Sequence, residues 1–139
     1  MILLDTNVVS AIMRIDQEPA VQIWLAAQDI TRLHVPIMVI FEIQFGIECA
    51  PVGRKRRNVE EQRSRVFNTF IADRVVQFDT IAAQEAAEVY AMPANRHRDE
   101  KVIDFQIAGI ARAHKAPLAT RNTKDFAGLG ILLVNPWGP

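Results

Sequence analysis

The sequence has a single cysteine and no excess of either charge, and both shortages exclude classes of protein. Cys49 has no second cysteine to pair with among the 139 residues. An intrachain disulfide is therefore impossible, and a reducing compartment suits the chain. Lys and Arg together number 16, as do Asp and Glu, so the formal net charge is zero. Proteins that bind nucleic acid through bulk electrostatics are usually basic, so any contact with phosphate must come from a local patch.

Long apolar runs are also missing. None approaches the ~20 residues that a membrane-spanning helix needs. The N-terminus lacks the basic segment and the cleavage site of a signal peptide. We therefore expect a cytoplasmic protein with no membrane contact. Half of the residues are hydrophobic, and repeats, low-complexity segments and linkers are absent, which predicts one compact domain over residues 1–139.

Short strand-like runs alternate with longer helical segments along the chain. Strands separated by helices indicate a parallel sheet with helices on both faces. We therefore expect an α/β fold of three α/β/α layers around a central, mostly parallel sheet. The predicted strands cover 2–5, 32–36, 75–78, 117–120 and 131–134, and the predicted helices cover 19–28, 37–50, 81–92 and 102–114.

Three acidic side chains lie where an ordinary core would not place them. Asp5 ends the first strand-like run, and ligands of parallel sheets bind beyond the carboxyl ends of the strands. Glu42 lies within the apolar segment VIFEIQF, and Asp104 lies within VIDFQIA. A buried carboxylate must be paired, protonated or bound to a metal. No Lys or Arg is three or four residues from Glu42, and only Lys101 has that spacing from Asp104.

Each acid also has a purely structural explanation. Asp5 can cap a helix that begins at Thr6, Asp104 can be a first-turn acid favoured by the helix dipole, and Glu42 can face solvent. The joint placement of the three favours function. Carboxylates that converge within ~5 Å would repel by roughly 3 kcal/mol per pair at an effective dielectric of about 20. A divalent cation removes that conflict, and all-oxygen sites suit Mg²⁺ or Mn²⁺ rather than zinc.

Several short segments together resemble a PIN domain, and more narrowly the VapC and FitB toxins of type II toxin–antitoxin pairs. They are LLDTN, FEIQFG, DFQIAGIARAH, LATRNTKDF and the final NPW, and they span nearly the whole chain. The resemblance implies a PIN-like fold and a metal-dependent endoribonuclease that hydrolyses RNA with activated water. It also implies a cognate antitoxin and a homodimer as partners.

The resemblance assigns roles to individual residues. Asp5, Glu42 and Asp104 match the acids that bind Mg²⁺ in the family. A fourth position follows the late strand, where some relatives carry an aspartate and this chain has Asn122; Asp125 is the nearest acid. Further contacts around the site are expected from Thr6 and Thr120, a turn-holding role from Asn7, and RNA binding from Arg96, Arg98 and Arg121.

Other functions remain open at this stage. A phosphohydrolase of the haloacid-dehalogenase kind also places an aspartate after the first strand, but it needs a second aspartate where this chain has Asn7. A receiver-like signalling module needs an acidic pair and a late lysine, where Arg121 stands here. A PIN fold that has lost catalysis and only binds nucleic acid or protein is the third alternative, because position 122 lacks an acid.

Overall fold

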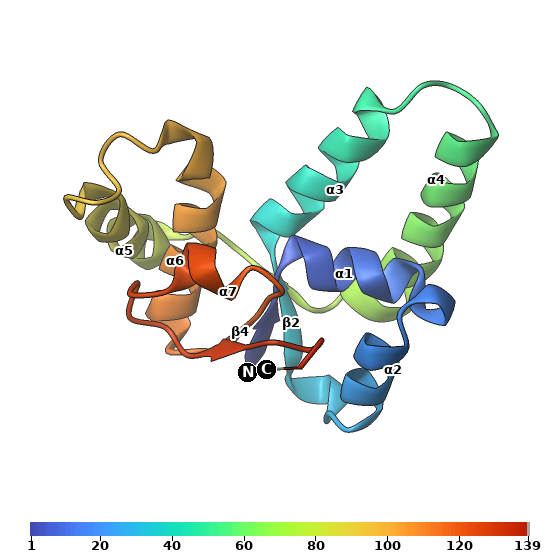
Figure 1. The fold of residues 1–139 in the computed structure, drawn as a ribbon, viewed down its shortest axis with the longest axis horizontal. Helices are drawn as coiled ribbons and strands as arrows, with labels where there is room; N and C mark the ends of the chain where they lie inside the picture. The colour runs from blue at the N-terminus through green and yellow to red at the C-terminus, as the bar shows by residue number, and fades with distance from the viewer. Residues whose placement is uncertain (139) are drawn as a thin grey trace.

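A computed structural model of the chain describes residues 1–138. Its centre is a five-stranded sheet in the order β3-β2-β1-β4-β5, and all of the strand pairs in it are parallel (Figure 1). The predicted parallel α/β architecture is confirmed. The strands are β1 (Ile2–Leu4), β2 (Leu33–Pro36), β3 (Val75–Val76), β4 (Leu118–Ala119) and β5 (Leu133–Val134).

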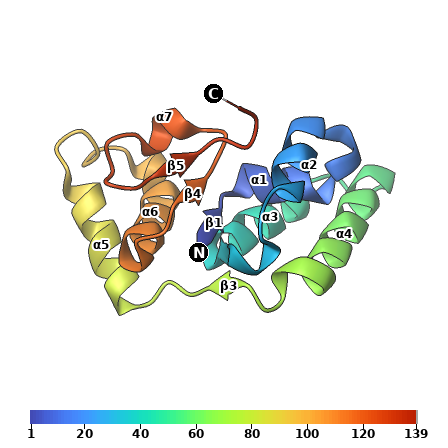
Figure 2. The same ribbon diagram turned by 90° about the horizontal axis from the view of Figure 1, so that it is seen from below.

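Helices cover both faces of the sheet, as the alternation of elements predicts. In Figure 2 the strands run between α5 and α6 on one side and α1 to α4 on the other. The helices are α1 (Thr6–Met13), α2 (Pro19–Ala26), α3 (Ile37–Cys49), α4 (Arg54–Val66), α5 (Thr80–Ala91), α6 (Val102–His114) and α7 (Thr123–Phe126). Short helical turns are η1 (Ile15–Gln17), η2 (Ile30–Arg32), η3 (Phe67–Ile71) and η4 (Asp99–Lys101).

The helices α1, α4 and α7 are outside the predicted ranges, and α1 is the one that begins beside Asp5. Asp5 stands between β1 and α1 with extended backbone and accepts a hydrogen bond from the Thr6 N–H, which makes it the N-cap. Val8, Val9 and Ile12 are buried along α1, so the apolar residues after Asp5 belong to a helix rather than to an extended strand. The capping explanation for Asp5 is therefore correct, and it coexists with the role discussed below.

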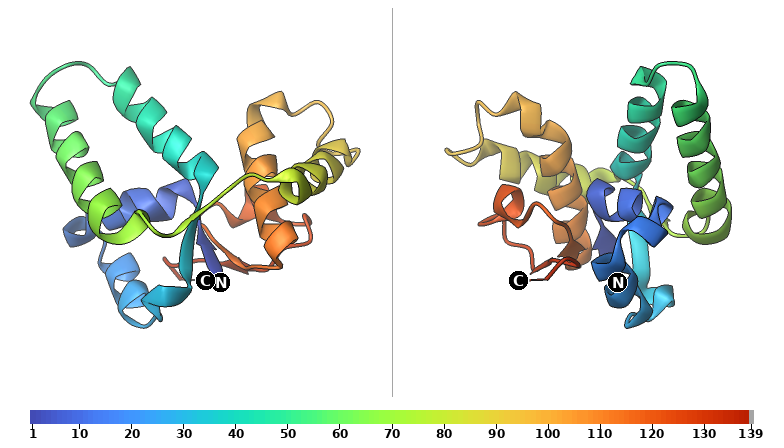
Figure 3. Two further views of the ribbon diagram at one scale, coloured as in Figure 1. Left: turned by 180° about the vertical axis from the view of Figure 1, so that it is seen from behind. Right: turned by 45° about the vertical axis from the view of Figure 1, so that its right-hand side comes forward.

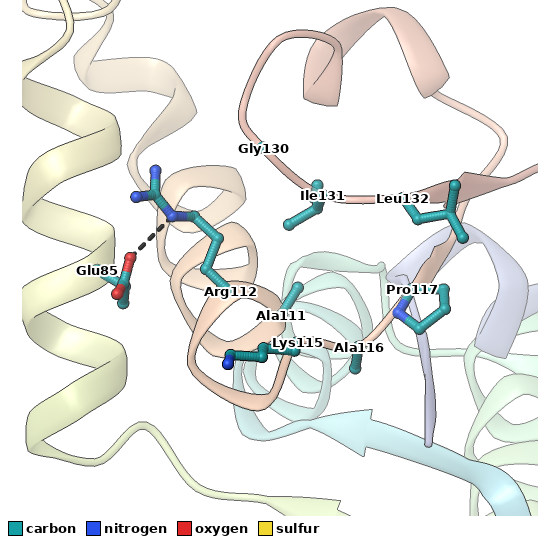
Figure 4. A pocket seen from close by; sticks show the side chains of 9 residues that line it. All are labelled: Glu85, Ala111, Arg112, Lys115, Ala116, Pro117, Gly130, Ile131 and Leu132. Atoms are coloured by element: carbon teal, nitrogen blue, oxygen red, sulfur yellow. Dashed lines mark ion pairs between the residues drawn. The ribbon is translucent and has the colours of Figure 1, made fainter.

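The helices α5 and α6 approach each other closely because Gly109 of α6 has no side chain. A Cβ built at Gly109 would lie 2.5 Å from the Ala82 carbonyl oxygen and 2.6 Å from the Ala86 Cβ. Arg112 adds an ion pair to Glu85, with Nε 2.8 Å from Oε2, beside a pocket of about 380 Å³ at the amino end of β4 (Figure 4). This pocket is at the amino ends of the strands, whereas Asp5 is at the carboxyl ends. The ion pair of Arg112 with Glu85 joins α5 to α6.

Because the strands are parallel, the residues that follow them lie together at the carboxyl ends of the sheet. β1 and β4 are neighbours, with Leu4 opposite Ala119, so the residues that follow them, Asp5 and Thr120, emerge side by side. α3 and α4 form an antiparallel pair on one side of this edge, while α6 and α7 lie on the other (Figures 1 and 3). Within residues 1–138, no helix combines the length and the apolar character that a membrane crossing requires.

Candidate active site

Asp5 is the centre of the site and is held by three donors. Asp5 is buried, with only 4% of the residue exposed. Oδ1 accepts the Thr6 backbone N–H at 2.8 Å, and Oδ2 accepts the Thr120 hydroxyl at 2.7 Å and the Asn7 amide at 3.1 Å. Burial raises the pKa of Asp5, and these hydrogen bonds partly oppose that rise. The carboxylate is thus oriented without being neutralised by a basic side chain.

Thr6 connects this carboxylate to the second acid. Its hydroxyl donates to Glu42 Oε1 at 2.6 Å, while its backbone N–H contacts Asp5. Burial raises the pKa of Glu42, the bond from Thr6 lowers it, and the charge of Asp5 raises it further. The donor of this hydrogen bond lies on α1, 36 residues away in the sequence, so local spacing gives no sign of it.

Asp104 is in the first turn of α6, and it is the acid with the most perturbed titration. Burial first, and then the charge of Asp5, raise the pKa of Asp104 to about 6; Lys101 opposes this rise, and Glu42 and Asp125 add to it. The charges of Asp5, Glu42 and Asp125 all act on Asp104, so the four carboxylates interact electrostatically. The raised pKa of Asp104 thus reflects burial first and the neighbouring carboxylates second, with Lys101 as a partial counter-charge.

Lys101 is the basic side chain of this cluster. Its Nζ lies 3.7 Å from Asp104 Oδ2 and 3.2 Å from Asp125 Oδ2, so it bridges the start of α6 and α7. The Asp125 contact is the main reason that the pKa of Lys101 is raised. From the sequence, Lys101 is visible only as a weak partner three residues before Asp104. Its second contact, 24 residues along the chain, has no signal in local spacing.

The oxygen donors of the cluster fit a hard cation, although the carboxylates do not form a complete coordination site. Across residues 1–138, no three His, Cys, Asp or Glu side chains are grouped so as to hold a metal ion. The carboxylates of Asp5, Glu42 and Asp104 therefore do not form the closed metal centre that a convergence within ~5 Å would give. The donors named above are nevertheless all oxygens, and burial and like charge raise the pKa values of Asp5, Glu42 and Asp104. A divalent cation relieves that kind of repulsion.

The remaining polar residues expected around the site form a network beneath it. Thr120 is fully buried, and its hydroxyl also accepts the Asn122 backbone N–H at 3.0 Å. Asn7 contacts Asp5 through its amide group and accepts the Arg121 backbone N–H at 3.0 Å through Oδ1. Asn7 therefore connects the turn after β1 to the turn after β4. The side chain of Asn122 is exposed.

The three arginines expected to bind RNA differ in their surroundings. Arg96 donates from Nε to the Ala91 carbonyl at 2.6 Å, at the end of α5, and Arg98 lies 3.6 Å from Glu100. Arg121 has its guanidinium carbon 4.9 Å from the centre of the Trp137 ring. The contact of Arg121 with Trp137 cannot be inferred from the sequence spacing.

A groove of about 610 Å³ between α1, α3 and α4 adjoins the acids, since Thr6 and Glu42 are among its lining residues. Its wall is largely apolar, and a basic segment at the start of α4 contributes to the lining. The apolar members include Met13, Ile43, Ile47, Val52 and Val59, and the basic members are Arg14, Arg54, Lys55 and Arg56.

Comparison with known proteins gives matches that cover almost the entire chain. The family model described as PIN domain matches residues 2–131. VapC ribonuclease Y4jK of Sinorhizobium fredii is 32% identical, over 100% of this chain and 99% of its own length. Plasmid stability protein StbB of Pseudomonas syringae pv. tomato is 33% identical over 99% of both. The crystal structure of FitAcB from Neisseria gonorrhoeae superposes with a TM-score of 0.83, at 27% identity and over 99% of both chains.

Proposed function

The chain belongs to the PIN domain family, and on that premise we propose that it is the toxin of a type II toxin–antitoxin pair, acting as a metal-dependent endoribonuclease. The observation that carries this proposal is the set of mutually repelling carboxylates at the carboxyl ends of β1 and β4, in which Asp5 is buried and the others are half-buried. A relative named as a ribonuclease and a solved neighbour named FitAcB add support.

Asp5, Glu42, Asp104 and Asp125 are the residues that would hold Mg²⁺, with Mn²⁺ as a substitute. When bound, the cation supplies Lewis-acid polarisation of the scissile phosphodiester. Thr120 and Thr6 keep the carboxylates of Asp5 and Glu42 oriented through the hydrogen bonds described above. Hydrolysis by metal-activated water requires no side-chain nucleophile, and its expected products carry a 5′ phosphate and a 3′ hydroxyl.

Asp125 is a better candidate than Asn122 for the fourth position. Asp125 shares Lys101 with Asp104, and its charge acts on both Asp5 and Asp104. Calorimetric titration with Mg²⁺ distinguishes the two residues. Asp125→Asn should weaken binding more than Asn122→Ala does, and Glu42→Gln should weaken it as well. A larger loss in Asn122→Ala would assign the position to its amide oxygen instead.

The enzymatic part of the proposal is tested with total RNA and purified protein, with and without Mg²⁺. Cleavage should need the metal, the new ends should be 5′ phosphates, and Asp5→Asn and Asp104→Asn should abolish cleavage while folding is retained. Glu61→Gln, at an exposed position on α4, is the matched control and should cleave normally. An inactive wild type that still binds RNA or protein would instead identify a non-catalytic PIN module.

The proposed antitoxin would inhibit by placing a basic side chain among the carboxylates. Lys101 supports this idea, because an ammonium group already lies between Asp104 and Asp125. A guanidinium can pair with carboxylates through two parallel hydrogen bonds. The apolar groove between α1, α3 and α4 offers room for hydrophobic residues of the same segment. Inhibition should weaken as Mg²⁺ rises, and a tight partner that leaves cleavage unchanged would refute this mode.

The proposal also includes a homodimer, for which α3 offers an apolar surface. Phe41 and Phe45 stack with ring centres 6.2 Å apart and are 57% and 60% exposed. Glu48 and Arg63 line the same shallow groove, so a two-fold axis would bring opposite charges together. Sedimentation should show that a Phe41→Ser, Phe45→Ser variant is monomeric, while Ile23→Ser, at an exposed site on α2, stays dimeric.

A further inference from the structure

The segment after the last strand reaches back to the edge of the site through Trp137. The indole N–H of Trp137 donates to Glu18 Oε2 at 3.1 Å, and the backbone N–H of Trp137 donates to Asn135 Oδ1 at 3.0 Å. Glu18 is in turn held by Arg14, whose Nε and Nη2 lie 3.2 and 3.1 Å from Oε1. The ring is therefore fixed from two directions, by the turn of its own segment and by the start of α2.

Arg121 lies against this fixed ring. Its guanidinium carbon is 4.9 Å from the ring centre, within the range of a cation–π contact. Its backbone is anchored as well, because its N–H donates to Asn7 Oδ1 at 3.0 Å. Arg121 also follows Thr120, which donates to Asp5. An exposed arginine would otherwise sample many rotamers, and contact with a planar aromatic ring restricts them.

We propose that Trp137 and Glu18 are positioning residues that hold Arg121 at the edge of the active site, where its guanidinium binds an RNA phosphate next to the scissile one. This inference rests on the proposed ribonuclease function. Arg14, Glu18 and Arg121 together keep one net positive charge, so the cluster attracts a phosphate even though Glu18 is acidic. Stacking leaves the N–H edge of a guanidinium available, since the ring contacts its face.

A purely structural role for Trp137 is the alternative, in which the ring simply packs the last segment against α2. The two explanations differ in what they predict for Arg121. If Trp137 only packs, its loss lowers thermal stability and leaves the affinity for RNA unchanged in the protein that remains folded. If it positions Arg121, its loss weakens RNA binding by the same route as the loss of Arg121 itself.

The test uses the full chain and a synthetic oligoribonucleotide that spans a cleavage site mapped in total RNA. Arg121→Ala should raise KM about tenfold, the size of one charge-assisted contact, with kcat nearly unchanged. Trp137→Leu should reproduce most of this rise, and Trp137→Phe, which keeps an aromatic face, should restore part of it. Glu18→Gln, which keeps an acceptor for the indole, should have a small effect.

Two further measurements separate positioning from packing. The double variant of Arg121→Ala and Trp137→Leu should be no worse than Arg121→Ala alone, since both changes remove one contact. Binding should also be measured at several salt concentrations. Arg121→Ala and Trp137→Leu should each reduce the slope of log K against log salt concentration by about 0.7, which is the contribution of one phosphate contact on a single strand. Arg32→Ala, an exposed arginine at the amino end of β2, is the matched control and should change neither quantity.

The outcomes are distinguishable from a failure of the proposed function. Absence of cleavage by the wild type refutes the ribonuclease proposal itself. With an active wild type, an unchanged KM in Trp137→Leu, additive effects in the double variant, or a loss in kcat alone would each overturn the positioning role. Melting curves of all variants identify any change that acts through unfolding, and Trp137→Phe keeps the comparison possible if Trp137→Leu does not fold.

Discussion

Replacing Asp104 by asparagine should make the metal-free protein more stable, not less. A carboxyl group whose pKa rises on folding binds its proton more tightly in the folded state, so the folded state loses stability as pH increases. The pKa of Asp104 rises from 3.8 to about 6, mainly through burial and then through the charge of Asp5. At about 1.36 kcal/mol per pKa unit, this shift sets an upper bound of about 3 kcal/mol once the group is ionised in both states, and solvent screening of the half-buried side chain reduces the cost to roughly 2 kcal/mol.

The pH window follows from these two pKa values. Below 3.8 the carboxyl is protonated in the folded and unfolded chains, so it costs nothing. The cost develops between 3.8 and about 6 and is complete above that range. The difference between Asp104→Asn and the wild type should be roughly 2 kcal/mol at pH 7.5 and about half of that at pH 5.

Urea unfolding in EDTA at pH 5 and pH 7.5 measures this difference, and thermal unfolding at pH 7.5 gives an independent check. At about 2.1 cal/mol/K per residue, about 2 kcal/mol corresponds to roughly 7 °C in Tm for a chain of this length. Mg²⁺ should then stabilise the wild type more than the variant, because a ligand stabilises the state that binds it. Asp73→Asn, at an exposed turn before β3, is the control and should show no gain. A variant no more stable than the wild type at pH 7.5 would refute the electrostatic reasoning.

The remaining predictions concern the scaffold around the site. Gly109→Ala should destabilise the protein by about 2 kcal/mol, because its Cβ would meet the backbone of α5, whereas Gly46→Ala on α3 has space and should stabilise it slightly, as urea unfolding can measure. Asp79→Ala should cost about 1 kcal/mol, since Asp79 Oδ1 caps α5 through the Ala82 N–H; helix content on heating reports it. Thr120→Val should raise the pKa of Asp5 further and weaken Mg²⁺ binding in a calorimetric titration, because the 2.7 Å donor to Asp5 is removed.

Regular elements with a clear apolar pattern could be predicted from the sequence. The segment 102–114 is α6 with the same bounds, and 37–50 differs from α3 by one residue. α1 is harder to predict, because only Asp5, Thr6 and Asn7 separate its apolar residues from those of β1. A polar interruption after a strand indicates either a ligand-binding position or a helix cap; Asp5 is the cap, and the proposed function also gives it a metal-binding role.

The site acids could be found because an unpaired carboxylate in an apolar segment is unusual, but their partners could not. Glu42 accepts from Thr6, and Lys101 reaches Asp125; both contacts join residues far apart in the sequence. The contact of Arg121 with Trp137 is of the same kind. Local spacing predicts which residues need a partner, whereas the folded arrangement decides which residue provides it.

The charge balance of the site connects the metal, the antitoxin and the chain's own lysine. Asp5, Glu42, Asp104 and Asp125 carry four negative charges when ionised, and Lys101 supplies one positive charge, so three remain uncompensated. A divalent cation or an incoming guanidinium would reduce the same excess at the same carboxylates. In the proposed function both draw on one set of oxygens, so metal and inhibitor would compete. Lys101 compensates Asp104 and Asp125 only in part, so the site keeps a strong negative charge.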